Sequence, residues 1–261
     1  MTPALTNKMM KGARKAATAV MVLLLIMTAT ACMYPDQKSG ETRVSYRESV
    51  KRIQSAMDDF QKDQGILPII NADETTPRFE KFRIDLDQLQ KRGYLDDIPT
   101  TAFEKGGSAY FLVQNEETDP TVKVMDLVTV QKVNDVQRAV DLYKSKHDGQ
   151  LPAGEEIYPG IHTVDPDLAG TNNVELKSVY SGQDMSFIMD AKGVVYADYA
   201  FDIMQLIDKE GVKPSKDEDL RDYLIKSSDY VPVKSLPYEW SGDAPVANRR
   251  QGREAERTDW K

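Results

Sequence analysis

Cysteine and histidine are almost absent from the sequence. Cys32 is the only cysteine among 261 residues, and His147 and His162 are the only histidines. A single cysteine excludes a disulfide within the chain and any zinc site built from several cysteine ligands. The two histidines lie in unrelated contexts, and His147 ends a predicted helix, where the helix dipole favours a cation. The sequence therefore offers no set of ligands with the spacing of a zinc site.

Recognisable catalytic motifs are missing as well. No glycine-rich phosphate loop follows a predicted strand, and the Gly-x-Ser-x-Gly nucleophile motif does not occur. Acidic residues are plentiful, but the sequence does not place two carboxylates across a cleft with the opposite pKa values that glycoside hydrolysis requires. We therefore expect a protein that is not an enzyme and that uses no cofactor.

Long apolar runs are missing too, apart from one near the start. Residues 16–31 form a run shorter than the roughly twenty residues that a membrane-spanning helix needs. Four basic residues and no acidic residue precede it, and small residues lead up to Cys32. This order is typical of a secretory signal peptide, predicted here over residues 1–31. An uncleaved signal anchor with a buried thiol is the alternative.

The residues Ala29-Thr30-Ala31-Cys32 resemble the lipobox of bacterial lipoproteins. In that family the signal peptide is cut before the cysteine, which then carries a diacylglycerol group. Leucine is usual three positions before the cysteine, and Ala29 departs from that pattern. The resemblance implies lipidation of Cys32, with residues 32–43 as a lipidated tether. It also implies anchoring at the outer face of the cytoplasmic membrane, where acylation removes an otherwise unpaired thiol.

Negative charge dominates the rest of the chain. The whole sequence has a formal net charge of −8, and removal of residues 1–31 would leave 30 basic and 42 acidic residues. Such a surface repels nucleic acid and anionic lipid headgroups. We therefore expect no nucleic-acid partner, and we expect the lipid on Cys32 rather than charge to hold the protein at the membrane.

The same helix pattern occurs three times along the chain. Apolar residues spaced by three and four recur in residues 50–60 and 133–143, and more faintly in 199–214. Each helix is expected to stop at a Gly-x-x-Pro sequence. The first two copies share four residue types at matching positions: Gln54 and Gln137, Ala56 and Ala139, Asp58 and Asp141, and Phe60 and Tyr143.

Predicted strands lie between these helices in two pairs. Residues 108–114 and 121–130 form one predicted hairpin, and residues 185–190 and 193–199 form a tighter one. We therefore predict an α+β fold in which amphipathic helices pack on antiparallel β-hairpins.

One compact body is predicted for residues 44–240, because too few residues separate the modules for independent domains. Two small domains are the alternative. It consists of pseudo-repeats of a helix–Gly-x-x-Pro–hairpin module at 44–130, 131–197 and 198–240. Residues 241–261 are charged and lack apolar periodicity, so we predict a disordered tail.

Residues 86–113 (LDQLQKRGYLDDIPTTAFEKGGSAYFLV) place a short helix, Gly-Tyr-Leu and Ile-Pro before a hairpin strand. This order resembles the head domains of type II secretion pseudopilins and competence pilins, and it implies a pseudopilin-head-like fold. Pilins enter a filament through an apolar N-terminal helix that is cut at a glycine. The lipobox-like segment stands in its place here, so we expect a tethered monomer.

Several longer motifs extend along the chain: ACMYP (31–35), DQGILPI (63–69), TAFEKGGSAYFLV (101–113), DPTVKVMDL (119–127), GVVYADY (193–199) and YVPVKSLPY (230–238). With these motifs the chain resembles an uncharacterised lipoprotein family of endospore-forming Firmicutes. Members of that family are sometimes labelled as binding proteins of ABC transporters.

One acidic segment is a candidate calcium site. Residues 164–173 (VDPDLAGTNN) carry Asp165, Asp167, Asn172 and Asn173, and calcium requires six to eight oxygen ligands from such a loop. Solvated turn residues are the alternative interpretation.

The sequence thus favours a non-enzymatic, membrane-anchored extracytoplasmic lipoprotein. Its expected role is a binding or assembly module that faces an envelope protein or the cell wall, although the partner is not identified by any motif. The alternative is the solute-binding lipoprotein of an ABC transporter, against which the hairpin-rich pattern argues, since two-lobed binding proteins need repeated βαβ units. A cell-wall enzyme is the third hypothesis, and no residue supports it.

Overall fold

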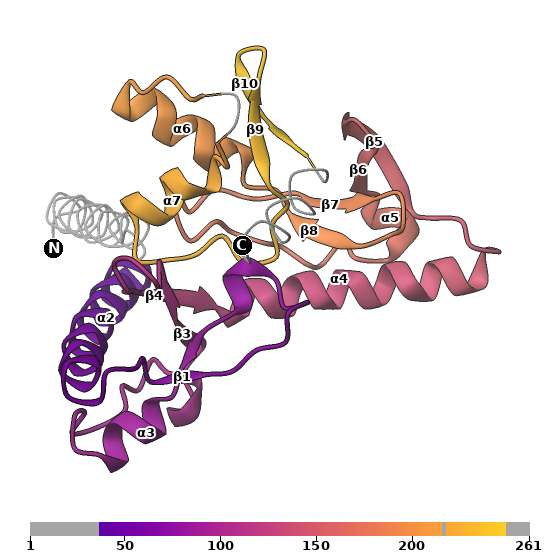
Figure 1. Cartoon of the computed structure of the whole chain (residues 1–261). Helices are drawn as coiled ribbons and strands as arrows, with labels where there is room; N and C mark the ends of the chain where they lie inside the picture. Colours follow the sequence, from indigo (N-terminus) through magenta and orange to yellow (C-terminus); the bar gives the residue numbers. More distant parts are fainter. Residues whose placement is uncertain (1–36, 216–217, 249–261) are drawn as a thin grey trace, which may run out of the picture. The chain divides into compact units, whose positions relative to one another are not determined.

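The computed structural model describes residues 37–215 and 218–248 (Figure 1). The chain divides into two compact units, residues 1–44 and residues 45–261. Only the end of the first unit is described, and it forms the N-terminal part of helix α2 (Gln37–Gln64). The elements below belong to the second unit.

The predicted signal peptide, residues 1–31, and the predicted lipidation site Cys32 lie outside the described residues. Residues 37–43 of the predicted tether are helical, so α2 begins earlier than the apolar pattern indicated. Among the residues that the structure describes, no helix combines the length and apolarity needed to cross a bilayer.

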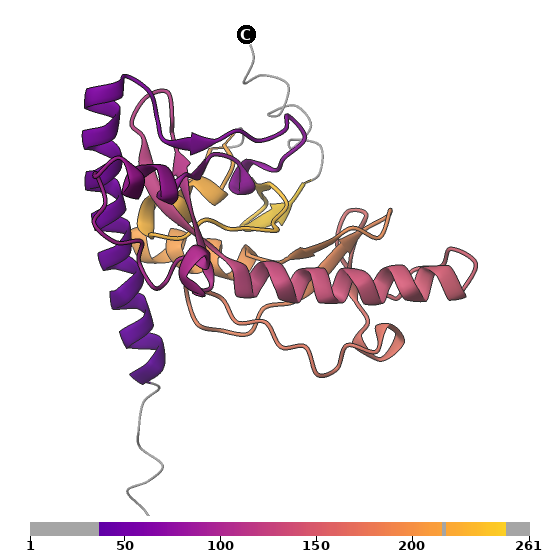
Figure 2. The same cartoon turned by 90° about the horizontal axis from the view of Figure 1, so that it is seen from below.

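A four-stranded antiparallel sheet packs against α2. Its strands lie in the order β1-β2-β3-β4: β1 (Ile69–Ile70), β2 (Arg83–Ile84), β3 (Ala109–Gln114) and β4 (Thr121–Asp126). The predicted apolar stripe on α2 is confirmed, because Ile53, Met57 and Phe60 are fully buried. They share one core with Phe111 and Val113 of β3, and Figure 2 shows α2 beside these strands.

A second four-stranded antiparallel sheet follows, and helix α4 (Leu127–Lys146) packs along it (Figure 1). Its strands lie in the order β5-β6-β7-β8: β5 (Ala153–Tyr158), β6 (Ile161–Val164), β7 (Phe187–Asp190) and β8 (Val195–Ala197). Helix α4 begins directly after β4, because the Asp126 carboxylate caps it by accepting the Thr129 amide at 2.8 Å. Val133, Val136 and Val140 form its buried stripe, as predicted.

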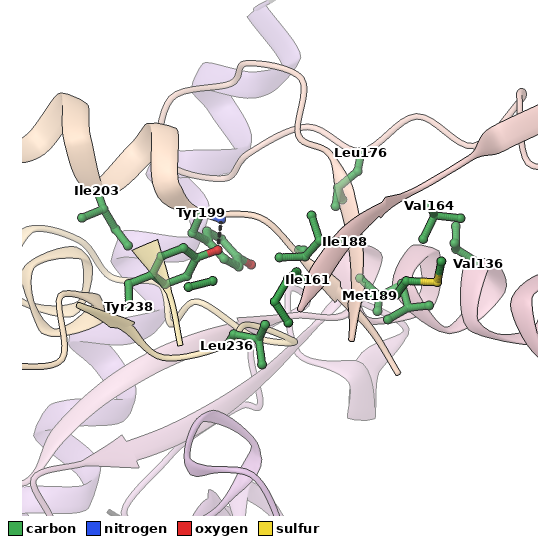
Figure 3. Close-up of a cluster of buried hydrophobic side chains, with 14 of the residues drawn as sticks. Val136, Ile161, Val164, Leu176, Ile188, Met189, Tyr199, Ile203, Leu236 and Tyr238 are labelled. Carbon is green, nitrogen blue, oxygen red and sulfur yellow. Dashed lines mark hydrogen bonds between the residues drawn. The ribbon is translucent and has the colours of Figure 1, made fainter. Parts of the chain in front are cut away.

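The third part is smaller, with two helices and one antiparallel hairpin. These elements are α6 (Ala200–Glu210), α7 (Arg221–Ser227), β9 (Tyr238–Ser241) and β10 (Ala244–Ala247). Short helical segments also occur in the first two parts: η2 (Arg78–Glu80), α3 (Leu86–Lys91), η3 (Phe103–Lys105) and α5 (Pro166–Ala169). The second and third parts share one hydrophobic core, in which Ile188 and Met189 lie with Tyr199, Ile203 and Tyr238 (Figure 3).

Gln54 ties helix α2 to the last strand of the first sheet. Its Oε1 accepts the Val122 amide at 2.7 Å, and its Nε2 donates to the Pro120 carbonyl at 3.0 Å. The same Nε2 donates to Asp58, one turn further along the helix, at 2.8 Å. One side chain thus fixes both the position of the helix and the start of β4.

Gln137 makes the matching bonds between α4 and the last strand of the second sheet. Its Oε1 accepts the Val195 amide at 2.7 Å, and its Nε2 donates to the Gly193 carbonyl at 2.8 Å. The same Nε2 donates to Asp141 at 3.0 Å, one turn further along the helix. The sequence match between Gln54 and Gln137 therefore corresponds to the same packing device, used twice.

The turns after the two long helices are also alike. Residues Gly65 and Gly149 have φ values of +71° and +86°, in the left-handed region that glycine adopts without steric cost. The carbonyl of Pro68 then accepts the Asp85 amide at 2.8 Å, and the carbonyl of Pro152 accepts the Asp165 amide at 2.9 Å. Each aspartate goes on to cap a short helix, α3 or α5.

Residues 229–234 are hydrogen-bonded to both sheets and are called the bridging segment below. Val124 of β4 donates its amide to the Asp229 carbonyl at 2.7 Å, and the Ala197 amide of β8 donates to the Lys234 carbonyl at 2.8 Å. The segment therefore forms one parallel bridge on the outer side of β4 and a single hydrogen bond to β8.

Two valines of the bridging segment are buried against the first sheet. Val231 and Val233 are each 1% exposed, and they share a core with Leu112 on the face of the first sheet opposite α2. The Tyr199 hydroxyl donates to the Val233 carbonyl at 3.0 Å. The segment thus closes the first sheet on its second face.

The α+β prediction is confirmed, but two boundaries were wrong. The strand predicted over 121–130 ends at Asp126, because that residue caps α4, so the module boundary at 130/131 falls inside a helix. The predicted disordered tail was wrong for residues 244–247, which form β10. Residues 249–261 lie outside the described residues.

Replacement of Gln137 tests the matching glutamine contacts. Gln137→Ala should lower the free energy of unfolding by about 1–3 kcal/mol, because the Val195 amide and the Gly193 carbonyl lose their partner. Gln131→Ala, at an exposed position of the same helix, is the control. It should change the free energy of unfolding by less than about 0.5 kcal/mol. Urea unfolding followed by circular dichroism measures both, and equal effects of the two variants would contradict this role.

Candidate functional site

The acidic segment predicted as a calcium loop is the start of helix α5. Oδ1 of Asp165 accepts the amides of Asp167 and Leu168 at 2.9 and 3.1 Å, which is the geometry of an N-cap. Oδ1 of Asp167 accepts the side-chain amide of Asn172 at 2.9 Å. Helix capping and turn formation account for these aspartates, in agreement with the alternative interpretation as turn residues.

The two histidines lie on different elements. His147 caps the C-terminus of α4, as predicted, with Nδ1 at 2.8 Å from the Tyr143 carbonyl. His162 belongs to β6. Among the described residues, no three His, Cys, Asp or Glu side chains gather closely enough to form a metal-ion cluster.

A pocket of about 90 Å³ lies between the segment that precedes β7 and the first turn of α6. It is called the Asp202 pocket below, and its lining residues are Ser178, Ser181, Gln183, Asp184, Met185, Ser186, Asp198, Phe201 and Asp202. Three of these side chains are carboxylates, three are hydroxyls, and none is basic. The pocket therefore has a negative, oxygen-rich wall.

Asp198 stands at the junction of β8 and α6, and its carboxylate is held by three donors. Oδ1 accepts the Tyr238 hydroxyl at 2.8 Å and the Ala200 amide at 3.0 Å. The Tyr158 hydroxyl lies 3.2 Å from Oδ1 and 3.1 Å from Oδ2. Burial, and then the Asp198 charge, raise the pKa of both tyrosines, so they remain neutral donors.

Tyr238 also links this carboxylate to the shared core. Its hydroxyl accepts the Tyr199 amide at 2.9 Å, the dashed line in Figure 3. The phenol thus accepts one hydrogen bond and donates another, with both the Tyr199 and Tyr238 side chains fully buried. This arrangement fixes the orientation of Asp198 at the wall of the pocket.

Asp202 lies one turn further along α6 and is only 4% exposed. Its Oδ2 accepts the Ser178 hydroxyl at 2.8 Å, and Ser181 also donates hydrogen bonds to this carboxylate. Burial raises the pKa of Asp202, and the nearby Asp198 charge adds to this effect. Ser178 and Ser181 oppose it by stabilising the ionised form, but burial dominates.

Sequence reasoning missed this pair of aspartates. The residues Asp198 and Asp202 are four positions apart in the sequence ADYAFDI, so both can face the same side of a helix start. Asp202 also interrupts the apolar stripe of α6, between Tyr199 and Ile203. An acidic residue at a position where the helix pattern calls for an apolar one was the signal in the sequence that could have revealed this pair.

Residues 46–126 match the family model of the YphF family N-terminal domain. The matched stretch runs from α2 to the end of β4, which is the first helix-and-sheet part of the fold. No curated protein and no solved structure matches the chain.

The raised pKa of Asp202 predicts a pH-dependent effect of Asp202→Asn. Since folding raises this pKa above its unfolded value, the aspartate favours the folded state at low pH, and that contribution is lost as the pH rises through the folded pKa. In EDTA the variant should therefore unfold at higher urea concentration than the wild type at pH 8. The difference between the urea midpoints of the variant and the wild type should decrease as the pH falls towards 4.

Asp167→Asn, at an exposed carboxylate, is the control. The difference between its urea midpoint and that of the wild type should not decrease in this way. Urea midpoints measured across the pH range test this expectation. A gap that widens as the pH falls would contradict it.

Proposed function

We propose that the protein is a lipid-anchored, extracytoplasmic lipoprotein that acts as a non-enzymatic binding module. Its partner would be another envelope protein or the cell wall, and Cys32 would carry the diacylglycerol that holds it at the outer face of the cytoplasmic membrane. The basic start, the short apolar run and the small residues before Cys32 support the anchor.

The bridging segment is the observation that carries the binding-module part of the proposal. Transporter binding proteins close two lobes around a solute by hinge motion. Here residues 229–234 are bonded to the last strand of each sheet, and two of their valines are buried against the first sheet, which opposes such a hinge. All seven pairs of named strands are antiparallel, unlike the parallel sheets of βαβ units.

The size of the Asp202 pocket also weighs against the solute-binding alternative. Its volume is about 90 Å³, whereas pockets that enclose small organic ligands measure roughly 300–1,000 Å³. A rigid body that presents one face to a macromolecule fits these features better than a body that encloses a solute.

The anchor predicts a specific effect of Cys32→Ser. Cells grown with a labelled fatty acid should transfer the label to the wild-type chain and not to the variant, because serine lacks the thiol that accepts diacylglycerol. The variant should also partition out of the membrane fraction. Thr30→Ser keeps the cysteine and a small residue before it, and it should be labelled as the wild type is. Label on Cys32→Ser would contradict the anchor.

The binding role predicts a defined adduct in crosslinked intact cells. The wild-type chain should yield one dominant adduct with an envelope protein or a wall fragment, identified by mass spectrometry. A released Cys32→Ser chain should lose it, because anchoring raises the local concentration at the membrane. Recovery of lipid alone would contradict this role, and a permease adduct would favour the transporter alternative.

A further inference from the structure

Helix α2 carries its charges in two separate groups along its length. Residues 43–52 include four basic residues and one acidic residue, Glu48, whereas residues 53–64 include three acidic residues and one basic residue. The dipole of a helix favours the opposite order, because it attracts acidic side chains to the N-terminal end and basic ones to the C-terminal end. The stability of the helix alone therefore does not account for this separation.

Three of the basic residues form one exposed surface in the part of α2 that packs on the first sheet. Arg47, Lys51 and Arg52 are exposed, whereas Val50 and Ile53 are buried in the core on the other side of the helix. Arg47 and Lys51 are one turn apart, and like charges at this spacing repel each other. These three side chains are called the basic face below.

Contacts within the chain leave most of this positive charge available. Arg47 pairs with Asp229 at 3.7 Å, but its side chain remains 69% exposed. Arg52 donates to the Asp97 carbonyl at 2.8 Å, which is a neutral partner. Lys51 makes no side-chain hydrogen bond or ion pair within the described residues. An anionic surface outside the chain could therefore engage all three side chains.

We propose that the basic face rests on anionic phospholipid headgroups and thereby orients the anchored protein on the membrane. The inference rests on the proposed anchor at Cys32. Helix α2 begins at Gln37, five positions after Cys32, and five residues of chain span at most about 18 Å. The basic half of α2 is therefore the described part of the chain that follows the lipid most closely in sequence.

Charge selects this face over the rest of the surface. The chain has a formal net charge of −8, so most of its surface is repelled by anionic lipids. Basic residues near such a membrane are attracted to it, and the attraction fades within a Debye length, about 10 Å at 0.1 M salt. The lipid on Cys32 supplies the high local concentration that a weak attraction needs. The acidic remainder of the surface then faces the envelope partner.

Acetylation of lysines in lipid nanodiscs tests the proposal. The lipidated chain, with its lipid on Cys32 verified by mass spectrometry, is reconstituted in neutral phosphatidylcholine discs or in discs that also contain phosphatidylglycerol. Acetylation of Lys51 should be about tenfold or more slower in the anionic discs, because two basic residues together favour the docked state roughly twentyfold. Lys146, exposed at the end of α4, should react equally in both. About 1 M salt should remove the difference, because the Debye length falls to about 3 Å.

Two variants of equal charge separate docking from a general effect of charge. Arg47→Gln should lower the protection of Lys51 by about fivefold, the contribution of one basic residue. Arg138→Gln is the matched control, because Arg138 is also an exposed helical arginine paired with one aspartate, Asp135. It should leave the protection of Lys51 unchanged.

Equal rates for Lys51 in the two kinds of disc would overturn the proposal, as would equal effects of the two variants. Protection of Lys51 by soluble wall fragments in neutral discs, with none in anionic discs, would assign the face to the wall and overturn it too. A purified chain without lipid on Cys32 would instead contradict the anchor, and this is measured before reconstitution.

Discussion

The arrangement of the second unit depends on the backbone bonds of the bridging segment. Strand β4 of the first sheet and strand β8 of the second have outer sides that would otherwise expose unpaired amides and carbonyls. Residues 229–234 bond Val124 of β4 and Ala197 of β8 on these sides and bury two valines against the first sheet. Removal of these contacts would expose strand edges and an apolar face together, so both sheets rely on one short stretch.

The two matched glutamines explain why the module repeats in structure as well as in sequence. Apolar contacts between a helix and a sheet are not directional, so they specify the position of the helix less sharply than hydrogen bonds do. An amide that accepts from one backbone group and donates to another allows a single position. Gln54 and Gln137 supply this constraint, and Asp58 and Asp141 hold the amides in place from the same helix. The family match over residues 46–126 covers only the first of the two helix-and-sheet parts, the one that contains Gln54.

Much of the fold could be predicted from the sequence, since its helices carry buried stripes three and four residues apart and end at glycine. Strands β5 and β6 were missed. The exposed residues of β5, such as Glu155 and Glu156, hide any alternation, and its pairing with β6 shifts register. Strand β10 was missed because Pro245 lies inside it and a charged segment follows. The sequence also concealed the bridging segment, since its pairing depends on strands more than thirty residues away.

The candidate site was harder to predict for a different reason. Metal and catalytic motifs reveal themselves by local spacing, whereas the Asp202 pocket draws its wall from a loop before β7 and from the start of α6. Only the tertiary fold brings Ser178 against Asp202, and only burial distinguishes this carboxylate from the many solvated ones. In contrast, Asp165 and Asp167 looked like ligands because capping aspartates and calcium ligands share the same residue types.

The position of the bridging segment in the chain bears on how the protein reaches its native state. Its residues follow both of the sheets that they join, and Val124 pairs with a residue about one hundred positions later. A chain that emerges N-terminus first can form the first helix and sheet early, including the β3–β4 pair, but Val124 on the outer side of β4 gains its partners only when the last part arrives. Contacts of such long sequence separation slow folding and leave strand edges open in the interval. We therefore expect the half-emerged chain, more than the finished protein, to need protection from aggregation.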